Sequence, residues 1–261
     1  MEISQEFNRY VAHLSEGLGH ADRHAGLRGY CTGLMLPLSR KSVEPMAARV
    51  DPLHASARHQ ALHHFVAKSE WSDAAVIARV RDWVMPTLGL DRGRYWIIDD
   101  TGFPKKGKHS AGVARQYCGQ LGKQGNCQVA VSLSLASVQG SLPIAYQLYL
   151  PKDWSTDPVR RKAAGVPETP AFATKPEIAL AQIRQAIGQG VPMGVVLADA
   201  GYGVMRPPFG TASLHWACST RWAFALAPQC GHRGLRRCCP KLGLGAASGR
   251  PSCAGNLAMS R

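Results

Sequence analysis

The sequence predicts an α/β protein in which an N-terminal helical region precedes a mixed β-sheet and an irregular, unfolded C-terminal tail follows it. Three observations support this prediction. Apolar residues recur at helical spacing late in residues 1–90, the period changes to that of strands within residues 91–203, and residues 204–261 keep no steady period. We therefore divide the chain into a helical region with a potential DNA-binding role, a sheet-forming core and a tail.

The helical prediction rests on the stretch that begins at His54 and ends at Gly89. Apolar residues there recur at intervals of three or four, which is typical of amphipathic helices. Ser72 is placed to cap the second of two helices, and Pro86 followed by Gly89 closes it. The histidines of this stretch lack a cysteine or acid that would complete a metal-ligand set, so we expect solvated or packing histidines.

Residues 91–203 show the order strand, hairpin, helix, strand. RYWIIDD is β-rich, and the alternating run NCQVAVSLSLAS pairs as a hairpin with SLPIAYQLYLP across a turn at Gln139–Gly140. A polar segment that resembles a loop follows, and then Pro176 opens a helix that Gly188 and Gly190 end. The apolar run MGVVLADAGYG suits a strand buried on both faces.

Acidic residues lie at the ends of the first and last of these strands. A helical crossover favours a parallel arrangement of the two strands, which would bring Asp99 or Asp100 close to Asp199. Neighbouring carboxylates repel each other unless a cation lies between them, and such a pair can hold divalent cations about 4 Å apart for displacement at a phosphodiester. The pattern predicts a metal site and leaves the first acid open between Asp99 and Asp100.

Charge and hydropathy restrict the partners. The formal net charge of +14 and the pI of about 9.7 favour a polyanion, nucleic acid before membrane. No apolar run of about eighteen residues occurs, so we expect no membrane span. The polar N-terminus has no apolar signal segment, and a cytoplasmic protein is the simplest interpretation.

Four segments, in this order, together resemble bacterial insertion-sequence transposases with a DDE catalytic domain: DDTGFPKKGKHSAGVARQYCGQLGKQGNCQVAVSLSLAS, LPIAYQLYLPKDW, GVPETPAFATKPEIALAQIRQAI and GVVLADAGYG. The resemblance covers roughly residues 50–203 and implies a ribonuclease-H-like core, with a three-stranded meander, a helix and a fourth strand. It places the first catalytic acid in a D-x-T-like pattern, which favours Asp99 with Asp100 as the alternative, and the second acid at Asp199.

The resemblance also implies a cofactor and partners. It implies Mg²⁺ or Mn²⁺ in a two-metal site held by Asp99 and Asp199, and DNA, both transposon ends and target, with a homo-oligomer assembling on it at the bacterial nucleoid. The third acid of the family, a Glu on a later helix, has no counterpart, because no Asp or Glu follows Asp199. We therefore expect weak or absent cleavage, and the alternative is a non-catalytic DNA-binding protein or regulator of transposition.

Basic residues follow the first acids, and they form either a solvated loop or a set of contacts to DNA phosphates. These residues are Lys105, Lys106, Lys108, Arg115 and Lys123. Cys118 and Cys127 have no zinc-site spacing, so we expect reduced cysteines that pack in the core.

The tail differs in kind from the rest of the chain. Residues 204–261 contain 8 Lys and Arg, no acid and five of the 8 cysteines. The codons for HWACSTRWAF, read in another frame, permit a helix, a glycine and a buried strand. We therefore predict a frame change between Gly203 and Gly210 in a truncated transposase, which sequencing of the gene tests.

Overall fold

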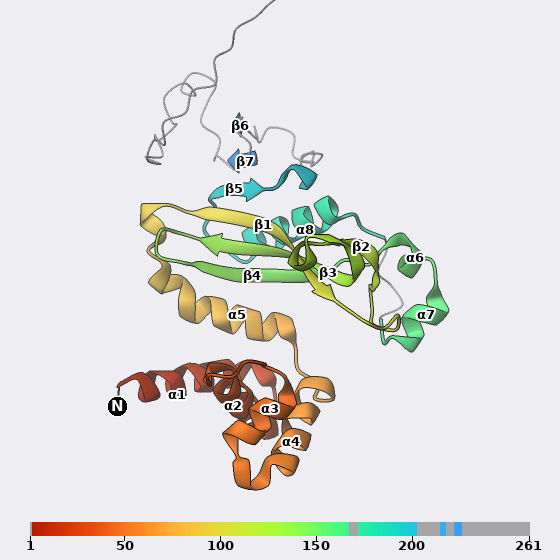
Figure 1. The fold of residues 1–261 in the computed structure, drawn as a ribbon. Helices are drawn as coiled ribbons and strands as arrows, with labels where there is room; N and C mark the ends of the chain where they lie inside the picture. Colours follow the sequence, from red (N-terminus) through yellow and green to blue (C-terminus); the bar gives the residue numbers. More distant parts are fainter. Residues whose placement is uncertain (1, 167–171, 203–214, 218–221, 226–261) are drawn as a thin grey trace, which may run out of the picture. The chain divides into compact units, whose positions relative to one another are not determined.

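The computed structural model describes residues 2–166, 172–202, 215–217 and 222–225 (Figure 1). The chain divides into two units, Met1–Ala227 and Pro228–Arg261, and the second lies outside the described residues. The segment 203–210, where the frame change is predicted, also lies outside them, as does most of the predicted tail. The predicted boundaries at residues 90 and 203 remain predictions.

The N-terminal region is helical, as predicted. Its apolar residues form a buried cluster of their own, centred on Val11, Leu14 and Phe65. Ser72 caps the last helix, because its Oγ accepts a hydrogen bond from the N–H of Ala75 at 3.2 Å. The helices are α1 (Glu2–Ser15), α2 (Asp22–Met35), α3 (Val43–Val50), α4 (Ala55–Ala67) and α5 (Asp73–Val84), with 3₁₀ turns η1 (Glu16–Leu18), η2 (Pro52–His54), η3 (Met85–Leu88) and η4 (Leu90–Arg92).

The core of the molecule is a mixed sheet with the strand order β2-β3-β1-β5-β7-β6, in which β4 also pairs with β3. The long strand β3 pairs with β1 along one edge, and its other edge pairs first with β2 and then with β4. The strands are β1 (Tyr95–Pro104), β2 (Ala114–Cys118), β3 (Lys123–Ala136), β4 (Ser141–Leu148), β5 (Val195–Ala198), β6 (His215–Ala217) and β7 (Trp222–Ala225), with η5 (Gly119–Leu121) and η6 (Ala200–Tyr202). The short strands β6 and β7 lie within the segment for which the sequence predicts irregular structure.

The predicted hairpin and the predicted parallel pair are both confirmed. Strands β3 and β4 are antiparallel, and β1 pairs with β5 in parallel from Tyr95 opposite Val195 to Ile98 opposite Ala198. Helix α8 (Lys175–Gly188) makes the crossover, and its N-terminus carries a capping box between Thr174 and Glu177. The crossover therefore brings the C-terminal ends of β1 and β5 together.

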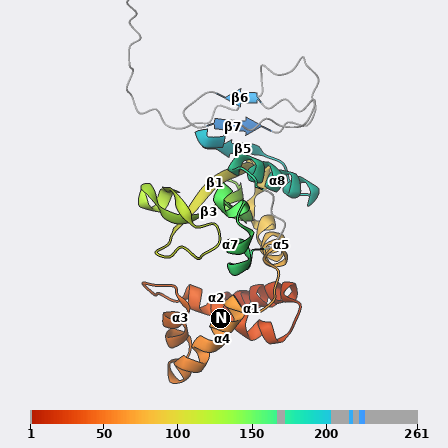
Figure 2. The same cartoon turned by 90° about the vertical axis from the view of Figure 1, so that its right-hand side faces the viewer.

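Helices α5 and α8 lie on the same side of the sheet (Figure 2). Side chains from both helices join one apolar cluster with those of the strands, in which Trp96, Leu133 and Leu135 are fully buried. Inside this cluster the amide of Gln182 donates to the carbonyl of Val131 at 2.9 Å. This side of the sheet is the principal core of the described chain.

The segment between β4 and α8 differs from the predicted loop, since it contains the short helices α6 (Lys152–Ser155) and α7 (Pro158–Ala163). Trp154 is fully buried and donates its indole N–H to the carbonyl of Val113 at 2.8 Å. Asp157 caps α7, and Pro158 occupies the first turn. Helices of four and six residues are too short to show a helical period in the sequence.

Strand β1 also continues further than the predicted strand. Its pairing with β5 ends at Ile98, whereas its pairing with β3 continues to Pro104. Asp99 and Asp100 therefore lie at the end of the parallel pair rather than at the end of β1. From this point on, one edge of β1 has no partner strand among the described residues.

The close approach of β5 to β1 depends on Gly194, which immediately precedes β5. A Cβ added there would lie 2.4 Å from the carbonyl oxygen of Arg94, the atom that accepts the N–H of Val195 at 3.0 Å. We expect Gly194→Ala to lower the free energy of unfolding by about 1–3 kcal/mol, because backbone atoms must shift. Urea unfolding measures this change. The matched control is Gly188→Ala, where an added Cβ meets nothing within 4 Å, and equal unfolding midpoints for the two variants would contradict the prediction.

Candidate active site

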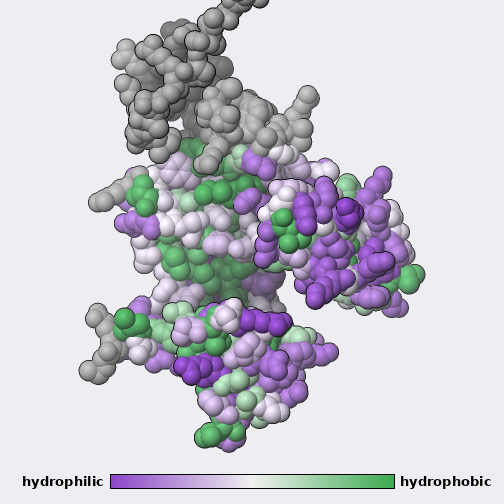
Figure 3. Space-filling view, in the orientation of Figure 1, coloured by the Kyte–Doolittle hydropathy of each residue, from purple (hydrophilic) through white to green (hydrophobic). Residues whose placement is uncertain are grey.

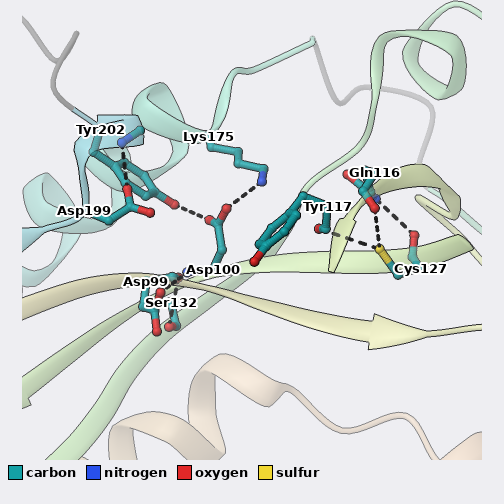
Figure 4. A network of polar contacts seen from close by, with 10 residues as sticks. Asp99, Asp100, Gln116, Tyr117, Cys127, Ser132, Lys175, Asp199 and Tyr202 are labelled. Carbon is teal, nitrogen blue, oxygen red and sulfur yellow. Dashed lines mark hydrogen bonds and ion pairs between the residues drawn. The ribbon is translucent and has the colours of Figure 1, made fainter. Parts of the chain in front are cut away.

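The two adjacent acids of β1 point to opposite faces of the sheet (Figure 4). Side chains alternate along a strand, so Asp100 shares the face of the buried residues Trp96 and Ile98, where α8 packs. Asp99 points to the other face and is exposed. The two carboxylates therefore have different surroundings although they are neighbours in the chain.

Asp100 has a partner for each of its carboxylate oxygens. The ammonium of Lys175, in the first turn of α8, lies 2.5 Å from Oδ2, and the hydroxyl of Tyr202 donates to Oδ1. The side chains of Asp100 and Lys175 are each 29% exposed, so the ion pair is partly shielded from water. Asp100 thus joins β1 to both α8 and η6.

Tyr202 lies at the centre of the acidic group. Its side chain is buried, and burial raises the pKa of its hydroxyl far above the ordinary value. The hydrogen bond to Asp100 and the negative charges of Asp100, Asp199 and Asp99 raise this pKa further. The hydroxyl therefore stays protonated and acts as a donor.

Asp99 and Asp199 keep part of their carboxylates free. Oδ1 of Asp99 accepts the N–H of Asp100 at 2.8 Å, and Oδ1 of Asp199 accepts the N–H of Gly201 at 2.9 Å. Ser132 donates to the backbone carbonyl of Asp99 at 3.2 Å, which ties this point of β1 to β3. Within the part of the chain that the structure describes, neither carboxylate forms an ion pair, and both residues are exposed.

The basic loop after β1 is held in place by other side chains. The amide of Asn126 donates to the carbonyls of Lys105 at 2.8 Å and Gly107 at 2.9 Å. Arg160 of α7 lies over the ring of Trp154 and donates to the carbonyl of Lys108 at 3.2 Å. Hydrophilic side chains gather over α6, α7 and the neighbouring loop (Figure 3).

The predicted phosphate-binding residues are exposed but distant from the acids. Lys105, Lys106, Lys108, Arg115 and Lys123 all lie on the surface. Six residues of extended strand separate Asp99 from Lys105, which corresponds to about 20 Å. These side chains therefore cannot contact a phosphate that lies at the acids.

Cys118 and Cys127 are free, buried cysteines, as predicted. They form a small cluster with Val129. Burial raises the pKa of the Cys127 thiol, with further contributions from Cys118. The pair therefore serves packing under β2 and β3.

Sequence reasoning missed the two partners of Asp100. Tyr202 was visible only as part of the motif ADAGYG, and Lys175 only as the residue before the proline that opens α8. Nothing in their local patterns indicates an interaction with a residue 75 or 102 positions away.

Comparison with known proteins assigns the family. The family model described as "DDE superfamily endonuclease" matches residues 13–228, so the chain belongs to this family. The match continues beyond the segment 203–210 and does not mark a boundary there. Membership implies a divalent metal and DNA as a partner.

The chain is also similar to a curated protein, the probable transposase for insertion sequence element IS701 from Microchaete diplosiphon. The two are 33% identical over 171 residues, which is 66% of this chain and 41% of that relative. The chain thus spans well under half the length of the relative that it matches. No helix among the described residues is long and apolar enough to span a membrane.

The donor atoms present fit the metal that the family implies. Carboxylate oxygens are the ligands that Mg²⁺ and Mn²⁺ prefer, and Asp99 and Asp199 offer oxygens that no cation occupies. Among the described residues, however, no three side chains of His, Cys, Asp or Glu converge on one point. The protein ligands described here are a pair.

The capping box of α8 makes a pH-dependent contribution to stability. The backbone N–H and the hydroxyl of Thr174 lower the pKa of the Glu177 carboxyl below its ordinary 4.5. A lowered pKa in the folded state gives stability above pH 4.5 that is lost as the pH falls through the folded value. We expect the difference in Tm between the wild type and Glu177→Gln, which can keep the cap but cannot titrate, to shrink below this pH. Thermal melts between pH 3 and 7 measure it, and a difference that does not change with pH would exclude this contribution.

Proposed function

We propose that the chain is the core of an insertion-sequence DNA transposase, with Asp99 and Asp199 as its metal-binding carboxylates. The observation that carries this proposal is the end of the parallel pair. Ile98 lies opposite Ala198, so the next residue of each strand is an exposed acid with an oxygen free of any cation. Asp100, the alternative first acid, already has Lys175 and Tyr202 on its oxygens.

The chemistry proposed for this site is cleavage and strand transfer at the ends of the transposon. Bound Mg²⁺ or Mn²⁺ would activate the attacking water or 3′-hydroxyl and stabilise the leaving oxygen. The chain's own residues hold this cation through Asp99 and Asp199, and the turn from Asp199 to Tyr202 fixes the second acid through the Gly201 N–H. Neutral Tyr202 adds no negative charge that would alter the charge of the site.

The basic loop would bind DNA at a distance from the reacting phosphate. A separation of about 20 Å corresponds to about six base pairs of B-form duplex at 3.4 Å each. Lys105, Lys106 and Lys108 would therefore hold the flanking duplex by its phosphates, without reading its sequence. Contacts to transposon ends and target, and assembly of several copies on DNA, belong to the same proposal.

A second candidate function is DNA binding without catalysis, as a regulator of transposition. The observation that favours it is the absence of any Asp or Glu after Asp199, which leaves the family's third acid without a counterpart. Two acids alone hold a metal pair poorly, so we expect weak or no Mg²⁺-dependent cleavage of transposon-end DNA by this chain. A version with the predicted frame restored should cleave. Full cleavage by the present chain would exclude the regulator.

Adjacent substitutions test which acid binds the metal. We expect Asp99→Asn and Asp199→Asn to weaken Mn²⁺ binding at least about tenfold with little change in Tm, because each removes an exposed ligand. Asp100→Asn should lower the Tm, since Lys175 loses its counter-ion, and should keep the Mn²⁺ affinity within a few-fold. Electron paramagnetic resonance of free Mn²⁺ gives the affinities. Loss of binding in Asp100→Asn with full binding in Asp99→Asn would reverse the assignment.

Substitution of the loop lysines tests whether they bind phosphates. Replacing Lys105, Lys106 and Lys108 by Gln should weaken binding to duplexes of any sequence. The slope of log affinity against log salt should become shallower by up to about 0.9 for each phosphate that the protein no longer neutralises. Fluorescence anisotropy at several salt concentrations measures both. The triple change to Arg keeps the charge and should bind like the wild type, and an unchanged slope in the Gln variant would argue for a merely solvated loop.

A further inference from the structure

We propose that Lys175, together with Tyr202, prevents Asp100 from binding the divalent cation and thereby assigns this role to Asp99. The proposal rests on the proposed function, since it explains how one of two adjacent carboxylates becomes the ligand. Lys175 is then a specificity-determining residue for the metal rather than a ligand or a catalytic residue.

The sequence places two chemically identical carboxylates at the same point, where the pairing of β1 with β5 ends. Asp100 is the more buried of the two and contacts Tyr202, which follows Asp199 by three residues. Without other partners, Asp100 could attract a cation as well as Asp99 does. Its two occupied oxygens are the difference between them.

Lys175 is well placed to keep that oxygen occupied. It lies in the first turn of α8, where the Thr174 and Glu177 capping box orders the backbone. Its ammonium lies 2.5 Å from Oδ2 of Asp100 and 5.6 Å from the ring centre of Tyr149, which adds a cation–π contact. A divalent cation would have to displace this ammonium, and the positive charge of Lys175 also opposes its approach.

Tyr202 blocks the second oxygen. Its hydroxyl donates to Oδ1 and stays on the protein side because the ring is buried. Asp99 has no such partners, as only the N–H of Asp100 engages its carboxylate. Removal of the ammonium should therefore release Asp100 as an additional ligand, whereas Asp99 needs no release.

Mn²⁺ binding to the full chain tests this inference without any need for activity. Asp99→Asn should weaken the affinity at least about tenfold. The double variant Lys175→Met/Asp99→Asn should regain affinity to within a few-fold of the wild type, because Asp100 replaces Asp99. Adding Asp100→Asn to this pair should abolish the regain. The matched control Lys162→Met/Asp99→Asn, which changes an exposed lysine of α7, should stay as weak as Asp99→Asn alone.

The outcomes separate the possible failures. If Lys175→Met/Asp99→Asn stays as weak as Asp99→Asn, Lys175 is only a structural ion pair and the inference is wrong. If Asp99→Asn itself leaves Mn²⁺ binding intact, the proposed function fails at its metal site. Should Lys175→Met not fold, as judged by circular dichroism, Tyr202→Phe/Asp99→Asn frees the other oxygen and should give a partial regain. Lys175→Arg/Asp99→Asn keeps a cation on Asp100 and should show none.

Discussion

The parallel pairing of β1 with β5 is the constraint on which the rest of the site depends. The two strands are separated by about a hundred residues, and α8 returns the chain so that both run in the same direction. Gly194 allows the backbones to meet, and the indole of Trp96 donates to the carbonyl of Pro192 just before β5. Because the pairing stops at Ile98 and Ala198, the acids that follow are placed together and face solvent.

The ion pair of Asp100 and Lys175 is the second element of this arrangement. A fully exposed pair would contribute little to stability, because water screens it and two flexible side chains must be ordered. This pair is partly buried, contacts Tyr202 as well, and joins three elements that the sequence separates widely. Its main consequence is chemical, since it neutralises one carboxylate beside another that stays free. Two neighbouring aspartates thus acquire different roles.

Family membership and the site geometry agree on phosphodiester chemistry, yet they also indicate an incomplete set of ligands. The described residues supply two acids, and the chain covers 41% of its curated relative. The basic loop lies too far along β1 to reach the reacting phosphate, so binding and catalysis occupy separate parts of the surface. A protein with this layout can hold DNA even where cleavage is weak, which is why metal binding and DNA binding are the informative measurements.

Local patterns predicted a large part of the fold. The alternating residues of β3 and β4, the turn between them and the cap and proline of α8 are short-range features, and the structure contains each of them. Helices α6 and α7 were not predictable, because Trp154 and Arg160 acquire their partners on the distant segment that ends at Val113. Strand β2 likewise depends on pairing with β3 rather than on a pattern of its own.

The sequence by itself determined the mixed sheet, the family and the presence of acids at the ends of two strands, because strand period, caps and motif order are written in neighbouring residues. It could not decide between Asp99 and Asp100 from the residues alone. That difference arises only in the tertiary structure, where alternation along β1 sends one side chain toward Lys175 and Tyr202 and the other to solvent. The physical reason is that the availability of a carboxylate depends on which charges and donors surround it, and these come from segments 75 and 102 residues away.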